Sequence, residues 1–327
     1  MRDKMKILIS TRTYNREHLL PRAVNSVLSQ TFTDFLYIIF NNGSTDNTQS
    51  LIDKYCKEDK RIISFSYSEN TRNPKILNER ILDQREKLNT IYSPLPSYYM
   101  NIDDDDFMES TTVETLYQLI TEYDADIASV GSKFVYPDGT MKDKYVFDGT
   151  FVFSRIEAMT ELLKREKFNA ASGGKLFRRE IEEDIEVPAV KMSRDIYTSY
   201  KKYNRIKRMV VTGEPLYYFY RHDNNQSGLE SAEQITPEKM RQHLEANAMR
   251  TEWLSEKMPE IKDFVFYCEL SFMISLYERI HRLQVESCYS IAQEMKETLM
   301  KSKLFLSECG HCTEREIEIL KLLEGDC

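Results

Sequence analysis

Short apolar runs alternate with amphipathic stretches between residues 6 and 136. Each apolar run is too short for a helix and is followed by polar turn residues, so it predicts a buried strand. The five runs are Lys6–Ser10, Phe35–Phe40, Arg61–Tyr67, Ser97–Asn101 and Asp126–Tyr136. Apolar residues at helical spacing predict helices over His18–Ser29, Pro74–Leu88 and Thr112–Tyr123. A further helix is predicted to begin after Ser44 or Thr45, either of which can cap it, and to end at about Glu58.

This alternation predicts an α/β fold, with a mostly parallel central sheet and helices on both faces. In such sheets ligands bind beyond the carboxyl ends of the strands. Polar clusters follow three of the predicted strands: Thr11–Arg16, Asn41–Asp46 and Asp103–Asp106. We therefore expect the three clusters to meet at one edge of the sheet and to form the functional site.

The run of four aspartates from Asp103 to Asp106 carries the clearest chemistry. Crowded carboxylates repel one another, so a bound cation would keep them ionised. Oxygen donors of this kind suit Mn²⁺ or Mg²⁺. Strand alternation would send Asp103 and Asp105 to the same face. A solvated acidic loop is the alternative, but the position directly after a buried strand favours a metal site.

The composition is that of an ordinary globular protein. Of 327 residues, 41% are hydrophobic and 30% are charged, which provides material for a sizeable core. The formal net charge of −8 argues against a nucleic-acid partner, because phosphate backbones attract basic surfaces. No apolar run has the length of a membrane span or a signal-peptide core. We expect a cytoplasmic protein, with any membrane contact peripheral and at the inner face.

Five segments together resemble a known family. They are Ile9–Gln30 (ISTRTYNREHLLPRAVNSVLSQ), Asn41–Asp46 (NNGSTD), Ile102–Phe107 (IDDDDF), Ser172–Arg179 (SGGKLFRR) and Pro215–Ser227 (PLYYFYRHDNNQS). In this order they resemble motifs of glycosyltransferase family 2, which has the GT-A fold and a DxD metal motif. The resemblance covers about residues 5–228 and implies inverting transfer of a sugar from a nucleotide-sugar donor, expected to be a UDP-sugar, to an acceptor hydroxyl.

The resemblance also implies how the donor is held. Arg12, Tyr14 and Asn42 would line the nucleobase pocket. Asp103 or Asp104 would hold the ribose, and Asp105 would ligate the metal that bridges the diphosphate. Two residues near the end of the last motif, Arg221 and His222, would close over the diphosphate.

Asp195 would be the catalytic base that takes the proton of the acceptor hydroxyl. A carboxylate within hydrogen-bond reach of an attacking hydroxyl fits that role. The acceptor itself is left open between a glycan, a lipid-linked molecule and a protein. A role in the synthesis of cell-surface polysaccharide or glycoconjugate is expected.

Two departures from the family pattern keep other functions open. Asn41 and Asn42 replace the usual pair of acids, and Arg194 replaces the usual Glu before the base. They motivate a second hypothesis, a catalytically inactive regulator that binds a nucleotide sugar, against which the intact aspartate run and Asp195 weigh. A third hypothesis, a nucleotidyltransferase-like enzyme, would call for a glycine-rich basic loop after the first strand, where this chain has Thr11–Arg16.

The chain changes character near residue 229. Glycine becomes rare, and long amphipathic helices are predicted over Pro237–Met258, Ile261–Leu283, Cys288–Lys303 and Thr313–Leu323. We expect a catalytic domain over residues 1–228 and a helical region over 229–327 that contributes to acceptor docking or to a homodimer. Cys309-Gly310-His311-Cys312 copies a dithiol motif, but its place between two predicted helices favours a simple turn.

Overall fold

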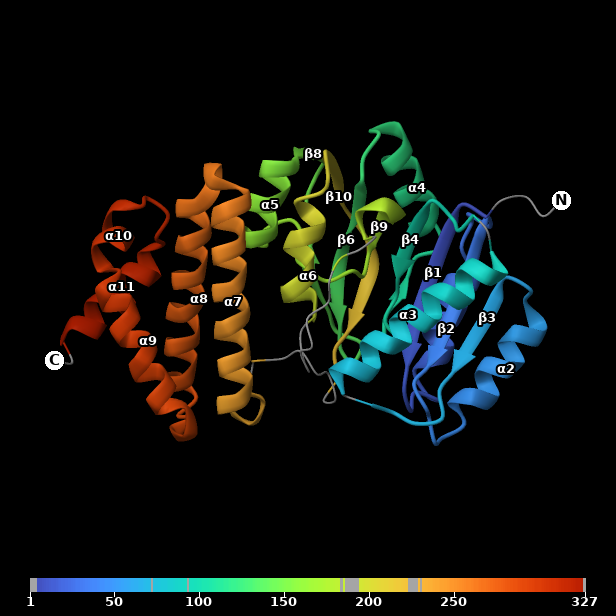
Figure 1. The fold of residues 1–327 in the computed structure, drawn as a ribbon, viewed down its shortest axis with the longest axis horizontal. Helices are drawn as coiled ribbons and strands as arrows, with labels where there is room; N and C mark the ends of the chain where they lie inside the picture. The colour runs from blue at the N-terminus through green and yellow to red at the C-terminus, as the bar shows by residue number, and fades with distance from the viewer. Residues whose placement is uncertain are drawn as a thin grey trace. The chain divides into compact units, whose positions relative to one another are not determined.

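The computed structural model describes residues 5–71, 73–92, 94–182, 185, 194–222, 229 and 231–325. The chain divides into two compact units, Met1–Asp223 and Asn224–Cys327. The first unit contains a curled sheet with helices around it, and the second is helical (Figure 1).

The first half of the sheet is parallel. Its strand order is β3 (Ile62–Ser66), β2 (Phe35–Asn41), β1 (Ile7–Thr13) and β4 (Tyr98–Asn101). The connecting helices are α1 (Leu20–Leu28), α2 (Thr48–Glu58) and α3 (Pro74–Ile91), and α4 (Thr112–Glu122) follows β4. All of these elements were predicted from the sequence, with small shifts at their ends.

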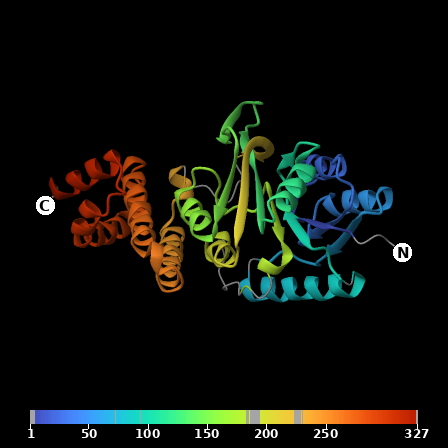
Figure 2. The ribbon, with the colours of Figure 1, turned by 90° about the horizontal axis from the view of Figure 1, so that it is seen from above.

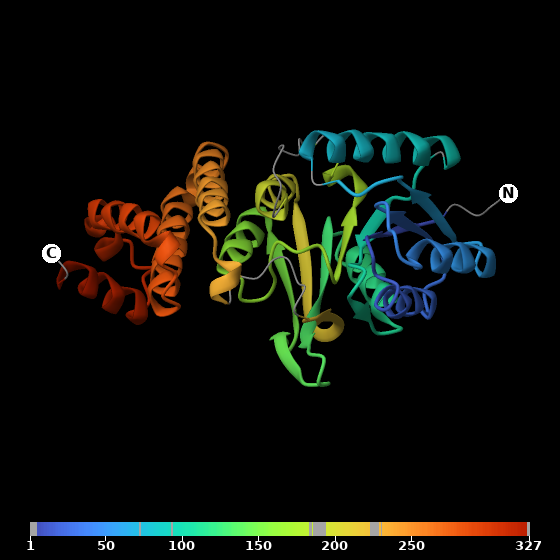
Figure 3. The same cartoon turned by 90° about the horizontal axis from the view of Figure 1, so that it is seen from below.

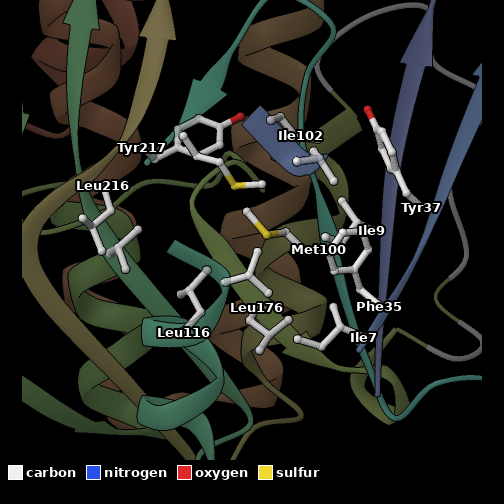
Figure 4. Close-up of a cluster of buried hydrophobic side chains, with 14 of the residues drawn as sticks. Ile7, Ile9, Phe35, Tyr37, Met100, Ile102, Leu116, Leu176, Leu216 and Tyr217 are labelled. Atoms are coloured by element: carbon white, nitrogen blue, oxygen red, sulfur yellow. The ribbon is translucent and has the colours of Figure 1, made fainter. Parts of the chain in front are cut away.

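Alternate residues of these strands serve two different cores. Ile7 and Ile9 of β1 pack with side chains of α1, α2 and α4 on one face. Figure 2 shows these helices on the side of the sheet opposite to α3, and Figure 4 shows Ile7, Ile9 and Leu116 of α4 in the same cluster. Leu36 and Ile38 of β2 pack with Leu88 of α3 on the other face. Figure 3 shows α3 lying along that face of the sheet. Every residue of β2 is buried, as expected for a central strand covered on both sides.

The second half of the sheet is mixed. It continues from β4 through β9 (Lys175–Arg178), β6 (Ile127–Val135) and β10 (Arg208–Tyr220) to β5 (Phe107–Met108). β6 and β10 pair in parallel, whereas β9 runs antiparallel to both β4 and β6. β7 (Met141–Tyr145) pairs antiparallel with β6 across a turn at Pro137–Gly139. β8 (Thr150–Ser154) pairs with β10, and the helices of this half are α5 (Arg155–Lys164) and α6 (Arg194–Tyr203).

The predicted cap of α2 is wrong. The helix begins at Thr48 after Asn47, which makes no side-chain cap bond. Ser44 instead accepts from the backbone N–H of Asn15 at 2.9 Å and donates to Asn41 Oδ1 at 2.6 Å. The serine is therefore used to join two loops, and the helix starts one turn later.

The second unit consists of five α-helices among the described residues. They are α7 (Pro237–Lys257), α8 (Lys262–Arg282), α9 (Tyr289–Lys301), α10 (Lys303–Glu308) and α11 (Glu314–Gly325). The second unit has two apolar clusters, and α8 contributes buried residues to both, for example Leu276 to one and Ile274 to the other. Cys309 and Cys312 are free thiols in the turn between α10 and α11, as predicted. Among the described residues, no helix has the length and apolarity that crossing a membrane requires.

Candidate active site

Hydrogen bonds hold the loop after β1 against the loop after β2. The Asn15 side chain accepts from the backbone N–H of Thr45 at 2.8 Å. The backbone N–H of Arg16 donates to Thr48 Oγ1 at 2.9 Å, and that of Glu17 donates to Asp46 Oδ2 at 3.2 Å. Asn15 has a φ of 51°, in the left-handed region that Asn tolerates better than most residues. The first two predicted polar clusters therefore do lie together.

Gly43 brings a third loop into contact with these two. Its φ is +81°, and a Cβ at this position would lie 2.3 Å from the backbone carbon of Glu69 and 2.7 Å from the nitrogen of Asn70. Only glycine allows this approach. The segment after β3 thus borders the same edge of the sheet.

The aspartate run forms a turn between β4 and β5. β4 ends at Asn101, and the backbone N–H of Asp106 donates to the carbonyl oxygen of Asp103 at 3.2 Å. The prediction of strand alternation for Asp103 and Asp105 is therefore wrong, since the strand has ended before the run begins. The four carboxylates are used in different ways instead.

Asp106 is a buried anchor for β10. Its carboxylate accepts from Tyr217 Oη at 2.8 Å and from the backbone N–H of Tyr220 at 3.0 Å. Gly173 and Gly174 lie against Tyr217, where a Cβ would come within 2.8 Å and 3.1 Å of the ring or its Cβ. The Gly-Gly pair therefore makes room for the tyrosine that binds this aspartate.

Asp105 contacts the end of β10. His222 Nε2 lies 2.9 Å from Asp105 Oδ2, and Arg22 Nη2 donates to the Asp105 carbonyl oxygen at 2.6 Å. The Arg22 guanidinium also lies over the Tyr220 ring, 3.9 Å from its centroid. The predicted metal ligand and the predicted diphosphate residue His222 are thus neighbours.

Arg12, Asp103 and Asp195 form an electrostatic group from three separate elements. Burial raises the pKa of Asp103 to about 7, the charges of Asp105 and Asp195 add to this, and Arg12 opposes it. Burial also raises the pKa of Asp195, against the opposing charges of Lys202 and Lys175. Burial lowers the pKa of Arg12, which Glu182 and Asp103 counteract. All three side chains nevertheless remain accessible to water. Groups that are surrounded by protein atoms but still reached by water are expected on a concave surface.

Asp104 is paired with Arg16. Arg16 Nε lies 3.5 Å from Asp104 Oδ1. Burial raises the pKa of Asp104 to about 6. The charge of Asp105 raises this pKa further, whereas the charge of Arg16 lowers it. This carboxylate joins the loop after β1 to the aspartate turn, so the three predicted clusters converge.

The remaining predicted residues border the same region. Tyr14 is 37% exposed in the loop after β1, and Asn42 donates its backbone N–H to the Thr13 carbonyl oxygen at 2.9 Å. The Arg221 guanidinium lies 4.4 Å from the centroid of the Phe134 ring. The side chain of Arg194 lies outside the described residues.

Sequence reasoning missed two lysines in this region. Lys175 is buried and donates from Nζ to the carbonyl oxygens of Asn169 and Ala171. Burial lowers its pKa to about 7, and the charge of Lys144 adds to this, whereas Asp195 opposes it. Lys175 directly follows the Gly-Gly pair in the SGGKLFRR segment, and this position is the signal in the sequence that could have identified the lysine. Lys144 lies on β7, which the sequence pattern did not reveal as a strand.

The donor set can be tested against the predicted metal. Among the described residues, no group of three or more His, Cys, Asp or Glu side chains is arranged to hold an ion. Asp105 and His222 offer one oxygen and one nitrogen donor 2.9 Å apart, beside the further carboxylates Asp103 and Asp104. Two such donors fit a divalent cation that takes its other ligands from a substrate.

Comparison with known proteins identifies the fold and the family of the chain. The α/β sheet with its helical region is a GT-A-type fold, and a crystal structure of Staphylococcus aureus TarS 1–349 in complex with UDP-GlcNAc superposes on it with a TM-score of 0.63. That alignment covers 98% of this chain and 80% of TarS 1–349 at 16% identity. The model of glycosyl transferase family 2 matches residues 9–186, and the chain belongs to this family.

Curated relatives are glycosyltransferases. The chain is 27% identical over 226 residues to glycosyltransferase GlyA of Streptococcus pneumoniae, a match of 65% of this chain and 30% of GlyA. It is 24% identical over 221 residues to the poly(ribitol-phosphate) β-N-acetylglucosaminyltransferase TarS of S. aureus, a match of 66% of this chain and 35% of TarS. The chain thus matches only about a third of the length of either relative, and a transferase activity is what they share.

Proposed function

We propose that the protein is a metal-dependent inverting glycosyltransferase that moves a sugar from a UDP-sugar to an acceptor hydroxyl. The single observation that carries this proposal is the convergence of Asp195 and His222 on Asp103 and Asp105 of the aspartate turn, at the edge of the sheet where β1, β2 and β4 end. The TarS neighbour in complex with UDP-GlcNAc supports the choice of a uridine donor. Mn²⁺ or Mg²⁺ is the proposed cofactor.

Donor binding would use the loops around Gly43. Tyr14 offers an exposed ring for a base, and the Asn42 amide can both donate to and accept from a uracil edge. Asp103 or Asp104 would accept from the ribose hydroxyls. Asp105 with His222 would hold the metal ion, whose charge would offset the negative charge of the departing nucleoside diphosphate.

Asp195 would accept the proton of the attacking hydroxyl. Its accessible carboxylate lies among the cations Lys202, Lys175 and Arg12, which favour the ionised form that a base needs. Direct displacement by that hydroxyl, on the face opposite the leaving diphosphate, would invert the anomeric centre. Arg221 would add positive charge at the diphosphate.

The acceptor class is proposed from the relatives. TarS is a poly(ribitol-phosphate) β-N-acetylglucosaminyltransferase, so a cell-surface glycan or glycoconjugate is the proposed acceptor here. Work at the cytoplasmic face of the membrane, through a peripheral contact, would suit such an acceptor. The helical unit would serve acceptor docking or homodimer formation.

A thermal-shift screen tests the proposal. UDP with Mn²⁺ should raise the melting temperature more than GDP, CDP or dTDP does, because a ligand that binds only the native state stabilises it. Asp105→Ala should remove the Mn²⁺-dependent part of the shift. A clear preference for another base would refute the uridine donor, and a full Mn²⁺ effect in Asp105→Ala would refute the metal assignment.

A further inference from the structure

One face of β10 looks toward the aspartate turn. Side chains of a strand alternate between its faces, so Tyr217 and Phe219 share one side. Arg221 directly follows the strand, and its backbone N–H continues the pairing with β6 by donating to the Val135 carbonyl oxygen at 2.8 Å. Tyr217 fixes the orientation of this side, because its hydroxyl donates to the buried carboxylate of Asp106 at 2.8 Å. Lys144 interacts electrostatically with both Asp106 and Arg221, so this face adjoins the aspartate turn and the proposed diphosphate residue Arg221.

Lys144 of β7 lies on this face in a group of aromatic rings. Its Nζ is 3.6 Å from the centroid of Phe219 and 4.8 Å from that of Phe134. The Arg221 guanidinium lies 4.4 Å from the same Phe134 ring. Two cations thus share one aromatic ring.

The structure assigns Lys144 no anionic partner within the residues it describes, unlike its neighbour Lys133, which pairs with Asp143 at 3.2 Å. The charged groups that act on Lys144 are Arg221, Asp106 and Arg165. Asp106 already accepts from Tyr217 and from the Tyr220 backbone. Burial and the charge of Arg221 lower the pKa of Lys144 to about 7. Aromatic rings attract a cation without neutralising it, so this arrangement favours an incoming anion.

We propose that Lys144 and Arg221 form a binding site for a phosphoryl group. The inference rests on the proposed function, because the phosphoryl group would belong either to the diphosphate of the donor or to a phosphate on the acceptor. Arg221 offers a planar fork and Lys144 a compact point charge, a pairing suited to the tetrahedral oxygens of phosphate. The rings of Phe134 and Phe219 hold the two cations in place.

Calorimetric titration of the full chain tests this site with Mn²⁺ present. The probes are UDP, uridine and glycerol 3-phosphate, the last titrated both alone and into protein saturated with UDP. Lys144→Met is the test variant, Lys144→Arg restores the charge, and Lys142→Met removes an exposed lysine of the same strand. Melting curves of each variant establish that it is folded.

If the donor supplies the phosphoryl group, Lys144→Met should weaken UDP binding about 10- to 100-fold and leave uridine binding unchanged. UDP should then exclude glycerol 3-phosphate. If the acceptor supplies it, glycerol 3-phosphate should still bind the UDP complex, and Lys144→Met should weaken that binding instead. In both cases Lys144→Arg should recover most of the affinity and Lys142→Met should keep all of it.

The site is refuted if Lys144→Met binds UDP and glycerol 3-phosphate as the wild type does, or if the wild type binds neither. Binding of glycerol 3-phosphate that depends on Lys144, without any binding of UDP or uridine, would uphold the site and count against the proposed uridine donor. The two proposals can therefore fail separately.

Discussion

His222 Nε2 lies 2.9 Å from Asp105 Oδ2, although 117 residues separate them in the sequence. The contact joins the end of β10 to the turn between β4 and β5. Asp106 fixes the same junction from inside, through Tyr217 and the backbone of Tyr220. The position of Asp105 therefore depends on a strand formed much later in the chain.

His222→Ala should weaken Mn²⁺ binding to the UDP complex by about 10- to 100-fold, because groups that ligate or orient a ligand contribute on that scale. Mn²⁺ titration at saturating UDP measures the change. His281→Ala, in the helical unit, is the control and should behave as the wild type. Unchanged Mn²⁺ affinity in His222→Ala would place the metal away from the Asp105–His222 pair.

Asp195→Asn should leave UDP-sugar binding intact and abolish transfer. The amide keeps the shape of the carboxylate but cannot accept a proton, and general-base catalysis is worth about 10²- to 10⁴-fold in rate. Donor binding by calorimetry and turnover with the same donor separate the two effects. Near-normal turnover in Asp195→Asn would move the base elsewhere, and Glu180→Gln is the next variant to measure.

As the pH is lowered, the rate of transfer should begin to fall at a higher pH than the pKa of an ordinary aspartate would give. Burial raises the pKa of Asp195, and a base works only when deprotonated, so kcat/KM should rise with pH through that raised pKa. Lys202 opposes the shift, so Lys202→Met should move this limb of the profile to higher pH. Lys201→Met, on the same helix, is the control. A limb that stays in place in Lys202→Met would show that Asp195 is not the titrating base.

Gly43→Ala should destabilise the protein more than Gly139→Ala does. Both glycines have positive φ, +81° and +83°, so both variants carry backbone strain of roughly 1–3 kcal/mol. Only at Gly43 would the new Cβ meet backbone, 2.3 Å from Glu69, whereas nothing lies within 4 Å at Gly139. Urea unfolding measures the difference, expected at about 1–3 kcal/mol. Equal losses of unfolding free energy in the two variants would show that the loop after β3 can move away from the new Cβ at little cost.

The accuracy of sequence reasoning followed the range of the interactions. β1 to β4 and their helices were predictable, because local periodicity sets them and the core only has to accept them. β9 was missed because Lys175–Arg178 is short and owes its strand form to pairing with β4 and β6. The three polar clusters were expected to converge from the parallel order alone. The different partners of Asp105 and Asp106 could not be predicted, since Tyr217 of β10 and His222 just after it lie more than 100 residues away in the sequence.

The last prediction concerns the helical unit, which we expect to contribute to association and not to chemistry. All the proposed site residues, up to His222, lie in the unit Met1–Asp223. Buried apolar side chains of α8 pack within the two clusters of the second unit, so their burial requires no partner molecule. Leu304 and Leu322 are nonetheless each 70% exposed, and they are apolar side chains of this unit that an association could cover. A two-fold homodimer is the simplest association that would cover them.

Truncation after residue 228 should therefore leave UDP binding measurable and convert a dimer into a monomer in light scattering. Leu304→Asp with Leu322→Asp in the full chain should lower the scattering mass in the same way without any effect on UDP affinity. A full-length protein that scatters as a monomer would end the dimer proposal. A folded truncated protein that binds no nucleotide would assign the helical unit to the donor site instead, because nothing else would have been removed.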